Sequence, residues 1–397
     1  MSWCQHHNNA CDDEHDVAGV DVLVVGGGPA GLAAAHAAAA AGQRTLVLER
    51  AAAIGTPIRT SGASWLRDVA ALGIPAELAH PIHEVRLIGP GRQARWRFAR
   101  PVACVLDVRG VYQSLAARAV GAGAAIRLRA TATAPLLQDG RVVGVQLRDG
   151  SVRATVTIDA SGTPRALAAR VGLGGPFRRL GVGVEYDMVA PAFDPQLALL
   201  LVGRQVAPRG YAWAFPHADG RVRVGVGLLR PDSNSDLDPR AFLERLLRHP
   251  ALAAALRGGQ PIELHTGAIP AEAPVGRLHV DGLLLAGDSA AQASPLVGEG
   301  IRYAIQAGRL AGEVAAAAAR ARDPSLLAAY GRAWHARYGR EMAVAYWLNR
   351  RFARYGDRNW RIVVSLLARL PPRLVAAGMH GDIAGWRPWD GRRGSVY

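Results

Sequence analysis

The chain has 397 residues, half of which are hydrophobic, and a formal net charge of +15. It contains no lysine, so its 47 basic residues other than histidine are all arginine, which excludes Schiff-base chemistry and a lysine general base. Its three cysteines provide no disulfide framework and suit a reducing compartment, so we expect a cytoplasmic protein.

The N-terminal residues 1–17 are predicted to form a flexible tail. No secretory signal is visible there, and no apolar run in the chain is long enough to predict a transmembrane helix. Residues 4–15 hold cysteine, histidine and acidic side chains, but their spacing fits no ordinary zinc motif. We therefore predict no metal site.

Residues 21–50 combine a short apolar strand, a G-x-G-x-x-G sequence, a helix of small residues and a second strand. Gly26 allows a tight turn, Gly28 lets the backbone approach a pyrophosphate, and Gly31 lets the helix pack closely on the strand. The phosphates would lie at the helix N-terminus, where free N–H groups favour negative charge. Glu49, at the end of the second strand, is placed to bind a ribose hydroxyl. This unit predicts a dinucleotide-binding α/β domain.

The pattern changes between the nucleotide-binding segments. Alternating apolar residues predict hairpins in 81–100 and 141–158, and further strands in 177–229. Residues 239–257 are predicted to be helical. These strands favour a separate antiparallel sheet beside the nucleotide domain, where such a sheet forms the roof of a substrate cavity.

Three aromatic residues alternate in the segment "PRGYAWAFPH" at 208–217. A strand here would place Tyr211, Trp213 and Phe215 on one face, and Pro216 is expected to end its hydrogen-bond ladder. Such a face is either part of a hydrophobic core or the wall of a binding cavity.

The last part of the chain is predicted to be helical and basic. From Arg332 to Arg373 there are ten arginines and two acidic residues, with aromatic residues interleaved. The segment 360–378 is predicted to be a basic amphipathic helix. Such a helix suits the surface of a membrane, here the inner face, and suits packing on the nucleotide domain equally well. No nucleic-acid recognition module is visible.

The order of the motifs resembles the hydroxylase-like branch of the two-dinucleotide-binding flavoproteins, over residues 20–325. The glycine-rich turn is followed by "VLDVRGVYQSLAARA" (105–119), "DASG" (159–162) and "GDSAAQASPLVGEG" (287–300). This resemblance implies a non-covalent FAD. The contacts that it implies are Gly26, Gly28, Ala30, Gly31, Glu49, Arg50, Arg109, Asp288, Pro295, Gly298, Gly300 and Ile301.

Three segments resemble the geranylgeranyl reductases more closely: "GYAWAFP" (210–216), "HTGAIPAEAP" (265–274) and "PLVGEGIRYAIQAGRLAGE" (295–313). This resemblance implies an enzyme that uses reduced FAD to saturate C=C bonds of a polyprenyl lipid or quinone side chain. It implies that the prenyl chain is lined by Tyr211, Trp213 and Phe215.

The proton donor is not identified by the sequence, and Tyr211 and His217 are the candidates among the side chains, with water as a third. Thr60 or Ser61 stands where many geranylgeranyl reductases have a cysteine. The sequence does not determine the electron donor. No second G-x-G-x-x-G unit exists for a nicotinamide nucleotide, so we expect either NADPH that binds transiently or a ferredoxin-like reductase partner.

Three alternative functions share this fold. A flavin monooxygenase would hydroxylate an apolar or aromatic substrate, and a quinone-linked flavoprotein would only transfer electrons. A flavin-dependent halogenase has a similar aromatic–proline signature but needs a lysine, which this chain lacks.

The expected fold is α/β, with a Rossmann-like FAD-binding domain, an antiparallel β-sheet substrate domain and a helical C-terminal region. The FAD-binding domain is expected to be discontinuous, over 18–80, 101–175 and 275–325. The substrate domain is expected over 81–100 and 176–274, and the helical region over 326–397.

Overall fold

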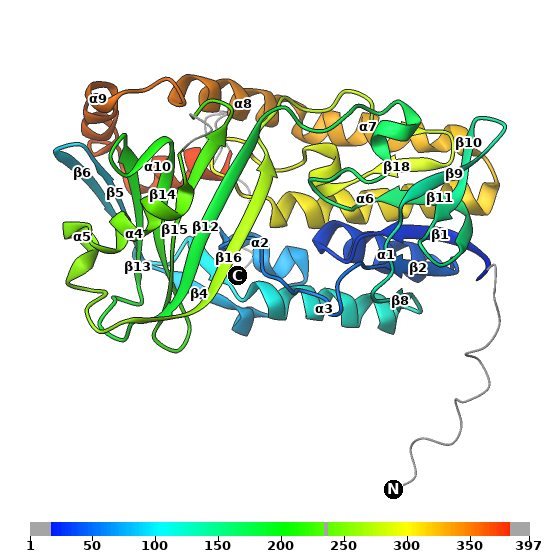
Figure 1. Ribbon diagram of the computed structural model, residues 1–397, viewed down its shortest axis with the longest axis horizontal. Coiled ribbons are helices and arrows are strands. Elements are labelled where there is room, and N and C mark those ends of the chain that lie inside the picture. Colours follow the sequence, from blue (N-terminus) through cyan, green and yellow to red (C-terminus); the bar gives the residue numbers. More distant parts are fainter. Residues whose placement is uncertain (1–16, 234–236, 382–397) are drawn as a thin grey trace, which may run out of the picture.

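The computed structural model describes residues 17–233 and 237–381. The tail predicted over 1–17 therefore lies outside the described residues, except for Val17, which begins the first strand. Figure 1 shows an elongated molecule with two main sheets at opposite ends.

The first sheet is the Rossmann-like core. Its central strands are parallel and lie in the order β18-β11-β1-β2-β8. Antiparallel strands extend it on one side of the order. β17 pairs with β18, and the β9–β10 hairpin pairs through β10 with β11, off the main order. The bounds are β1 Val17–Val25, β2 Thr45–Leu48, β8 Ala125–Arg127, β9 Ala134–Gln138, β10 Arg141–Gln146, β11 Ser151–Asp159, β17 His279–Val280 and β18 Leu283–Leu285.

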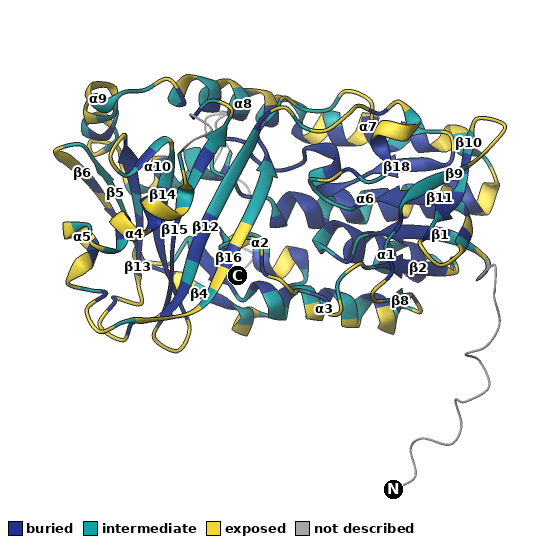
Figure 2. Cartoon of the chain, in the orientation of Figure 1, coloured by how far each residue is buried: buried dark blue, intermediate teal, exposed yellow. Residues whose placement is uncertain are grey.

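Helices α1 (Pro29–Ala40) and α6 (Ile301–Ala321) pack on this sheet and on each other at unusually short range. A Cβ atom at Gly308 would lie 2.0 Å from the carbonyl oxygen of Ala30, and one at Gly312 would lie 2.2 Å from that of Ala34. The small residues of both helices therefore let the two backbones touch. Figure 2 shows α1, α6 and β1 as largely buried.

The second sheet has seven strands in the order β16-β12-β15-β14-β13-β5-β6. All neighbours are antiparallel except β13 and β5. The bounds are β5 Glu84–Gly89, β6 Arg92–Arg97, β12 Leu180–Val189, β13 Leu197–Gly203, β14 Ala207–His217, β15 Arg221–Arg230 and β16 Gln260–Pro270. The hairpin predicted in 81–100 is confirmed as β5 and β6.

The two faces of this sheet have different partners. Alternate residues of β12 and β15, such as Val184, Val224 and Val226, pack in a core with α4 (Pro239–Leu247) and α5 (Pro250–Ala253). The opposite face carries Tyr211, Trp213 and Phe215, which pack in a second cluster with the C-terminal helices. Alternate residues along each strand therefore point either into the core with α4 and α5 or toward the aromatic face.

Pro216 does not end β14, contrary to the prediction, because the strand continues to His217. Pairing with β13 stops at Ala214, so from Phe215 onwards β14 has a neighbour only on the β15 side. A residue without an N–H group is tolerated where one side of a strand has no partner.

A small sheet and the remaining helices join the two main parts. The small sheet has the order β3-β7-β4. Its bounds and those of the helices beside it are β3 Ala63–Trp65, α2 Leu66–Leu72, β4 Ala79–Ile82, β7 Ala103–Leu106 and α3 Val108–Gly121. Short 3-10 turns lie at Ala76–Leu78, Ala168–Val171, Gly287–Ala290 and Pro324–Leu327.

The C-terminal helices run from the parallel sheet to the far end of the molecule (Figure 1). They are α7 Ala328–Trp334, a π-helical turn His335–Gly339, α8 Arg340–Phe352, α9 Asp357–Leu367 and α10 Pro372–His380. The single helix predicted over 360–378 is wrong, because Pro371 and Pro372 divide it into α9 and α10. Proline lacks the N–H group and clashes with the preceding turn of a helix. The domain boundaries given above stay a prediction.

A Gly308→Ala substitution should destabilise the protein by about 1–3 kcal/mol, because its Cβ would meet the backbone of α1 rather than a flexible side chain. Gly331→Ala in α7 is the matched control, since a Cβ there would lie 3.9 Å from its nearest neighbour, Leu278. That control should be neutral or slightly stabilising. Denaturant unfolding of both variants checks this, and equal midpoints would contradict the close contact of the helices.

Candidate active site

The glycine-rich turn has the shape that a bound pyrophosphate needs. Gly26 has a φ of +112°, and a Cβ there would lie 2.3 Å from the carbonyl oxygen of Ala160. A Cβ at Gly31 would lie 1.9 Å from the carbonyl oxygen of Gly26. A Cβ at Gly28 would instead meet nothing within 4 Å, so this position faces open space at the N-terminus of α1. These three observations fit the roles predicted for the glycines, and the open side of Gly28 fits a phosphate group.

Glu49 is held against this turn by the backbone. Its Oε2 accepts a hydrogen bond of 2.7 Å from the N–H of Gly27, and its Oε1 accepts one of 2.7 Å from the N–H of Ala51. Each carboxylate oxygen can accept a further bond, so the side chain is oriented to receive a sugar hydroxyl. Arg50 is exposed beside it. Ala30 packs against the turn that precedes α6, where a Cβ at Gly287 would lie 2.7 Å from its own.

Arg109 lies in the first turn of α3, whose N-cap is Asp107. Its Nη2 donates a hydrogen bond of 3.1 Å to Glu263 of β16, and its backbone lies against Gly55. The predicted cofactor arginine is therefore also bound to the second sheet, through an acidic residue that the sequence analysis did not identify.

Asp288 follows β18 and lies in the turn between that strand and α6. No described residue donates a hydrogen bond to its half-buried carboxyl group, and burial raises its pKa to about 6. An ionised carboxylate without a donor is costly in such a place. The hydroxyl groups of a bound cofactor would supply the missing donors, so Asp288 fits the predicted FAD contact.

The loop from Pro295 to Gly300 leads into α6 and is anchored from two sides. Tyr211 donates a hydrogen bond of 2.7 Å from its Oη to the carbonyl oxygen of Val297, and Asn349 of α8 donates one of 2.6 Å to that of Pro295. Gly298 has a φ of +72° and leaves room for the Tyr211 hydroxyl. Ile301 is buried in a core cluster at the beginning of α6.

The three rings of β14 form one continuous aromatic face. The ring centroids of Tyr211 and Trp213 are 5.6 Å apart, and those of Trp213 and Phe215 are 6.3 Å apart. Tyr211 is half-buried and closest to the loop before α6, while Trp213 and Phe215 are buried. The structure thus joins the predicted substrate residues to the predicted cofactor loop.

The two candidate proton donors have different surroundings. Burial raises the pKa of Tyr211 to about 12, so its hydroxyl keeps its proton at neutral pH. Burial, assisted by Arg223, lowers the pKa of His217 to about 4, so its ring is neutral. Neither ring nitrogen of His217 has a hydrogen-bond partner among the described residues. The hydroxyl of Tyr211 donates to Val297, and Tyr211 and His217 both stay predicted candidates for the proton donor, with water as the third.

The segment that lacks the expected cysteine lies against the second sheet. A Cβ at Gly267 of β16 would lie 2.1 Å from the carbonyl oxygen of Arg59, and Arg223 donates a hydrogen bond of 2.7 Å to that of Ser61. Cys104 is the only cysteine among the described residues. It is buried, and burial raises the pKa of its thiol to about 12.

Sequence reasoning missed three polar residues on the aromatic face: Glu185 of β12, and Glu263 and His265 of β16. Residues two positions apart in a strand point to the same face of the sheet. Glu185 follows Gly183 by two positions and His265 precedes Gly267 by two, and both glycines are on the aromatic face. This alternation was a usable signal. The pairing of strands far apart in the chain was not.

Two family models match the chain. One describes an FAD dependent oxidoreductase and matches residues 21–174, and the other describes the geranylgeranyl reductase catalytic domain and matches residues 180–269. Their boundary falls between β11 and β12.

Named relatives cover most of the chain. Digeranylgeranylglycerophospholipid reductase 1 of Methanopyrus kandleri is 37% identical over 315 residues, which are 77% of this chain and 82% of the relative. Reductase 2 of the same organism is 34% identical over 362 residues, 88% of this chain and 90% of the relative. A crystal structure of a geranylgeranyl bacteriochlorophyll reductase-like protein from Thermoplasma acidophilum superposes with a TM-score of 0.83 at 26% identity, covering 92% of this chain and 97% of that one.

Asp288→Asn should weaken FAD binding about 10-fold or more, because a neutral amide is a poorer acceptor than a carboxylate. A carboxyl group whose pKa is raised in the folded state contributes stability at low pH that is lost as pH rises toward 6. We therefore compare the melting temperatures of the two cofactor-free proteins. The value for the Asp288→Asn variant minus that for the unchanged protein should be higher at pH 7.5 than at pH 4.5.

Asp281→Asn, an exposed position in the turn between β17 and β18, is the matched control for Asp288→Asn. It should change neither FAD affinity nor the pH profile. Flavin fluorescence titration and thermal unfolding of the cofactor-free proteins measure both quantities. A pH-independent difference for Asp288→Asn would show that this carboxyl group is not desolvated.

Proposed function

Because this chain belongs to the geranylgeranyl reductase family of FAD-dependent oxidoreductases, we propose that its substrate is a digeranylgeranylglycerophospholipid, whose isolated C=C bonds it saturates. The identity to the reductases of Methanopyrus kandleri supports this substrate class. The single observation that carries it is the hydrogen bond from Tyr211 to Val297, which joins an apolar aromatic wall to the predicted flavin loop.

The residues present fit FAD. Gly28 would leave room for the pyrophosphate at α1, Glu49 and Asp288 would accept hydrogen bonds from hydroxyl groups, and Arg109 would add positive charge. Reduced FAD supplies the hydride for such a reaction when it is bound. The electron donor, NADPH or a ferredoxin-like protein, stays a prediction.

The aromatic face suits a substrate without charge. A prenyl chain offers few polar handles, so its recognition depends on buried apolar surface, at about 25 cal/mol per Å². Trp213 and Phe215 provide such surface, and Tyr211 keeps a proton at its Oη beside the loop. We propose Tyr211 as the donor of the proton that reaches the second carbon of the double bond. With Cys104 buried, no thiol among the described residues takes part.

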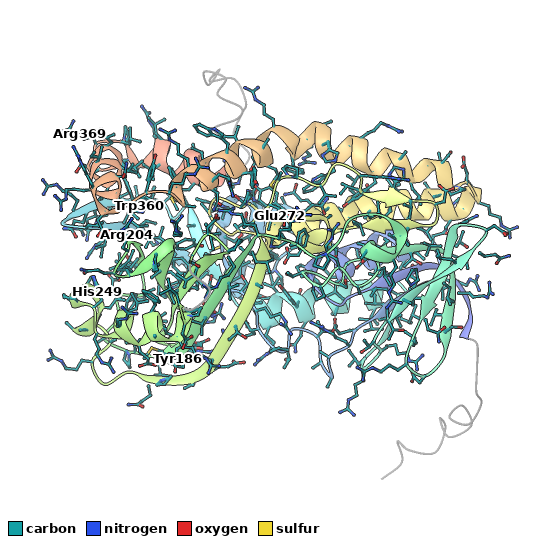
Figure 3. All side chains as sticks on the ribbon, turned by 45° about the horizontal axis from the view of Figure 1, so that its top comes forward. Tyr186, Arg204, His249, Glu272, Trp360 and Arg369 are labelled. Atoms are coloured by element: carbon teal, nitrogen blue, oxygen red, sulfur yellow. The ribbon has the colours of Figure 1, made fainter. Side chains whose placement is uncertain are left out.

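We further propose that α8, α9 and α10 contact an anionic membrane surface. Large apolar side chains there are strongly exposed: Trp347 59%, Ile362 52%, Leu366 56%, Leu370 40% and Leu374 46%. Exposed arginines alternate with them, at 351, 354, 358, 361, 369 and 373. Figure 3 shows Arg369 at the outer end of the molecule, whereas Trp360 lies inward of it. This mixture suits a lipid interface with negative headgroups.

A small cavity lies between the cofactor loop, α8 and α10. Leu296 of the loop, Ala345 and Leu348 of α8, and Met379 of α10 are among its lining residues. Among residues 17–233 and 237–381, no helix has the length and apolar content needed to cross a bilayer. The proposed contact is therefore peripheral, and two of its three helices, α8 and α10, also border the cavity.

The substrate proposal is tested with enzyme reduced by dithionite and incubated without oxygen with a digeranylgeranylglycerophospholipid. Mass spectrometry should find products heavier by two mass units for each C=C bond saturated. Product that forms only with oxygen and gains an oxygen atom would instead indicate a monooxygenase. Flavin reoxidation by quinone without any saturated lipid would indicate an electron-transfer flavoprotein.

Trp213→Ala should leave FAD affinity within about 3-fold and lower lipid turnover about 100-fold, because it removes much of the apolar wall. Trp96→Ala is a matched control, since Trp96 of β6 belongs to the same hydrophobic cluster but lies at the edge of the sheet. Fluorescence titration measures FAD binding, and anaerobic product formation measures turnover. Loss of FAD from the Trp213 variant would mean that the ring is needed for the fold of the cofactor site.

The membrane proposal predicts cosedimentation with vesicles of phosphatidylglycerol and phosphatidylcholine that weakens as salt rises. Ile362→Ser combined with Leu366→Ser should lower the bound fraction several-fold, because both side chains of α9 are exposed. Val120→Ser combined with Leu137→Ser is the control, since these residues are equally exposed on α3 and β9. Equal binding by both double variants would contradict the proposed surface.

A further inference from the structure

A line of polar side chains runs across the second sheet on the same face as the aromatic rings. Trp213 donates from Nε1 to Glu185 Oε2 at 2.9 Å, and His265 Nδ1 lies 2.9 Å from Glu185 Oε1. His265 Nε2 lies 3.3 Å from Glu263 Oε2, near enough for charge attraction but out of line for a hydrogen bond. Glu263 Oε1 then accepts the bond of 3.1 Å from Arg109.

The centre of this line is buried. His265 and Glu185 are each 3% exposed, and Trp213 is 8% exposed. Burial opposes protonation of His265, but the carboxylates of Glu185 and Glu263 outweigh it and raise its pKa. An imidazolium here pairs with the buried carboxylate of Glu185 and with the partly exposed carboxylate of Glu263. Without it, the buried charge of Glu185 would keep only the bond from Trp213.

The indole of Trp213 lies in a slot made by glycines of the neighbouring strands. A Cβ at Gly225 would lie 2.4 Å from the indole, and Cβ atoms at Gly227 and Gly183 would lie 3.4 and 3.5 Å from it. The slot lets the ring lie over the backbones of β15 and β12. Tyr211 and Phe215 flank the ring on the same strand, at centroid distances of 5.6 and 6.3 Å, but these apolar contacts do not fix its orientation in its own plane. The bond from Nε1 to Glu185 is the directional contact that fixes the ring.

We propose that His265 is a positioning residue for prenyl reduction, which acts through Glu185 to hold the Trp213 indole in its glycine slot. With the ring held down, it would not project toward the C-terminal helices that pack against this face, where the proposed function places the prenyl chain. Through Glu263, the same imidazolium also neutralises the acidic partner of Arg109, so the substrate wall and the flavin side of the site keep a fixed spacing. This inference rests on the proposed function, which assigns the prenyl chain to this face.

The substitution that tests it is His265→Gln, which retains an N–H donor but removes the positive charge. We expect kcat/KM for the lipid to fall about 10- to 100-fold, because a small misplacement of a positioning group has effects of that size. FAD affinity should change by less than about 3-fold, as Glu49, Asp288 and the glycine-rich turn remain intact. His279→Gln on the edge strand β17 is the matched control and should be silent.

A double-mutant cycle separates positioning from a general loss of structure. Trp213→Phe keeps a ring in the slot but has no N–H group to donate to Glu185. In that background, His265→Gln should lower kcat/KM by less than about 2-fold, because the path from His265 to the indole is already broken. An equally large effect of His265→Gln in both backgrounds would overturn the proposal.

A measurement without turnover distinguishes this inference from the substrate proposal. In the cofactor-free protein, His265→Gln should lower the melting temperature by about 2 °C or more, and by clearly less in the Trp213→Phe background. Additive shifts would overturn the coupling whatever the substrate is. If the coupling is found but the unchanged enzyme saturates no prenyl lipid, the proposed function fails and the positioning contact stands.

Discussion

The arrangement of the two sheets and their helices depends on glycines, whose lack of a side chain lets neighbouring segments approach closely. Helices α1 and α6 touch backbone to backbone because Gly308 and Gly312 have no Cβ, and this contact holds α6, the longest helix in the described residues, against the helix that follows the nucleotide-binding turn. The turn itself closes because Gly26 and Gly31 approach carbonyl oxygens too closely for any side chain. On the second sheet, Gly225 provides the slot for Trp213, and Gly267 lets the segment at Arg59 lie on the strand. Cofactor side and substrate side are therefore placed by the same kind of contact.

Local sequence predicted the parts of the site in which neighbours along the chain act together. The G-x-G-x-x-G turn, Glu49 at the end of β2 and the alternation of the β14 aromatics all follow from short-range geometry. The fold class followed from these motifs together. The boundaries of the C-terminal helices were harder to predict. The apolar pattern over 360–378 suggested one helix, whereas the chain breaks at Pro371 and Pro372 into α9 and α10.

The contacts that the sequence did not reveal depend on strands that meet only after folding. Glu185 and His265 are 80 positions apart and become partners because β12 and β16 pair in one register, in which Glu185 faces His265. Arg109 and Glu263 are 154 positions apart. Nothing within a window of ten or twenty residues indicates such pairs. Pro216 is a similar case, since its tolerance depends on how far β13 extends along β14.

The hydrogen bond between Tyr211 and Val297 has a consequence for the affinities of the two ligands that the site would bind. One end of this bond belongs to the strand that would contact the lipid, and the other to the loop that would contact the cofactor. A ligand that orders the loop would therefore also change the position or mobility of the aromatic face of β14. Thermodynamic linkage requires that the resulting effects of the two ligands on each other's affinity are equal. Whatever factor FAD contributes to the affinity for lipid, the lipid contributes to the affinity for FAD. If that factor exceeds one, each of the two ligands would bind this protein more tightly in the presence of the other.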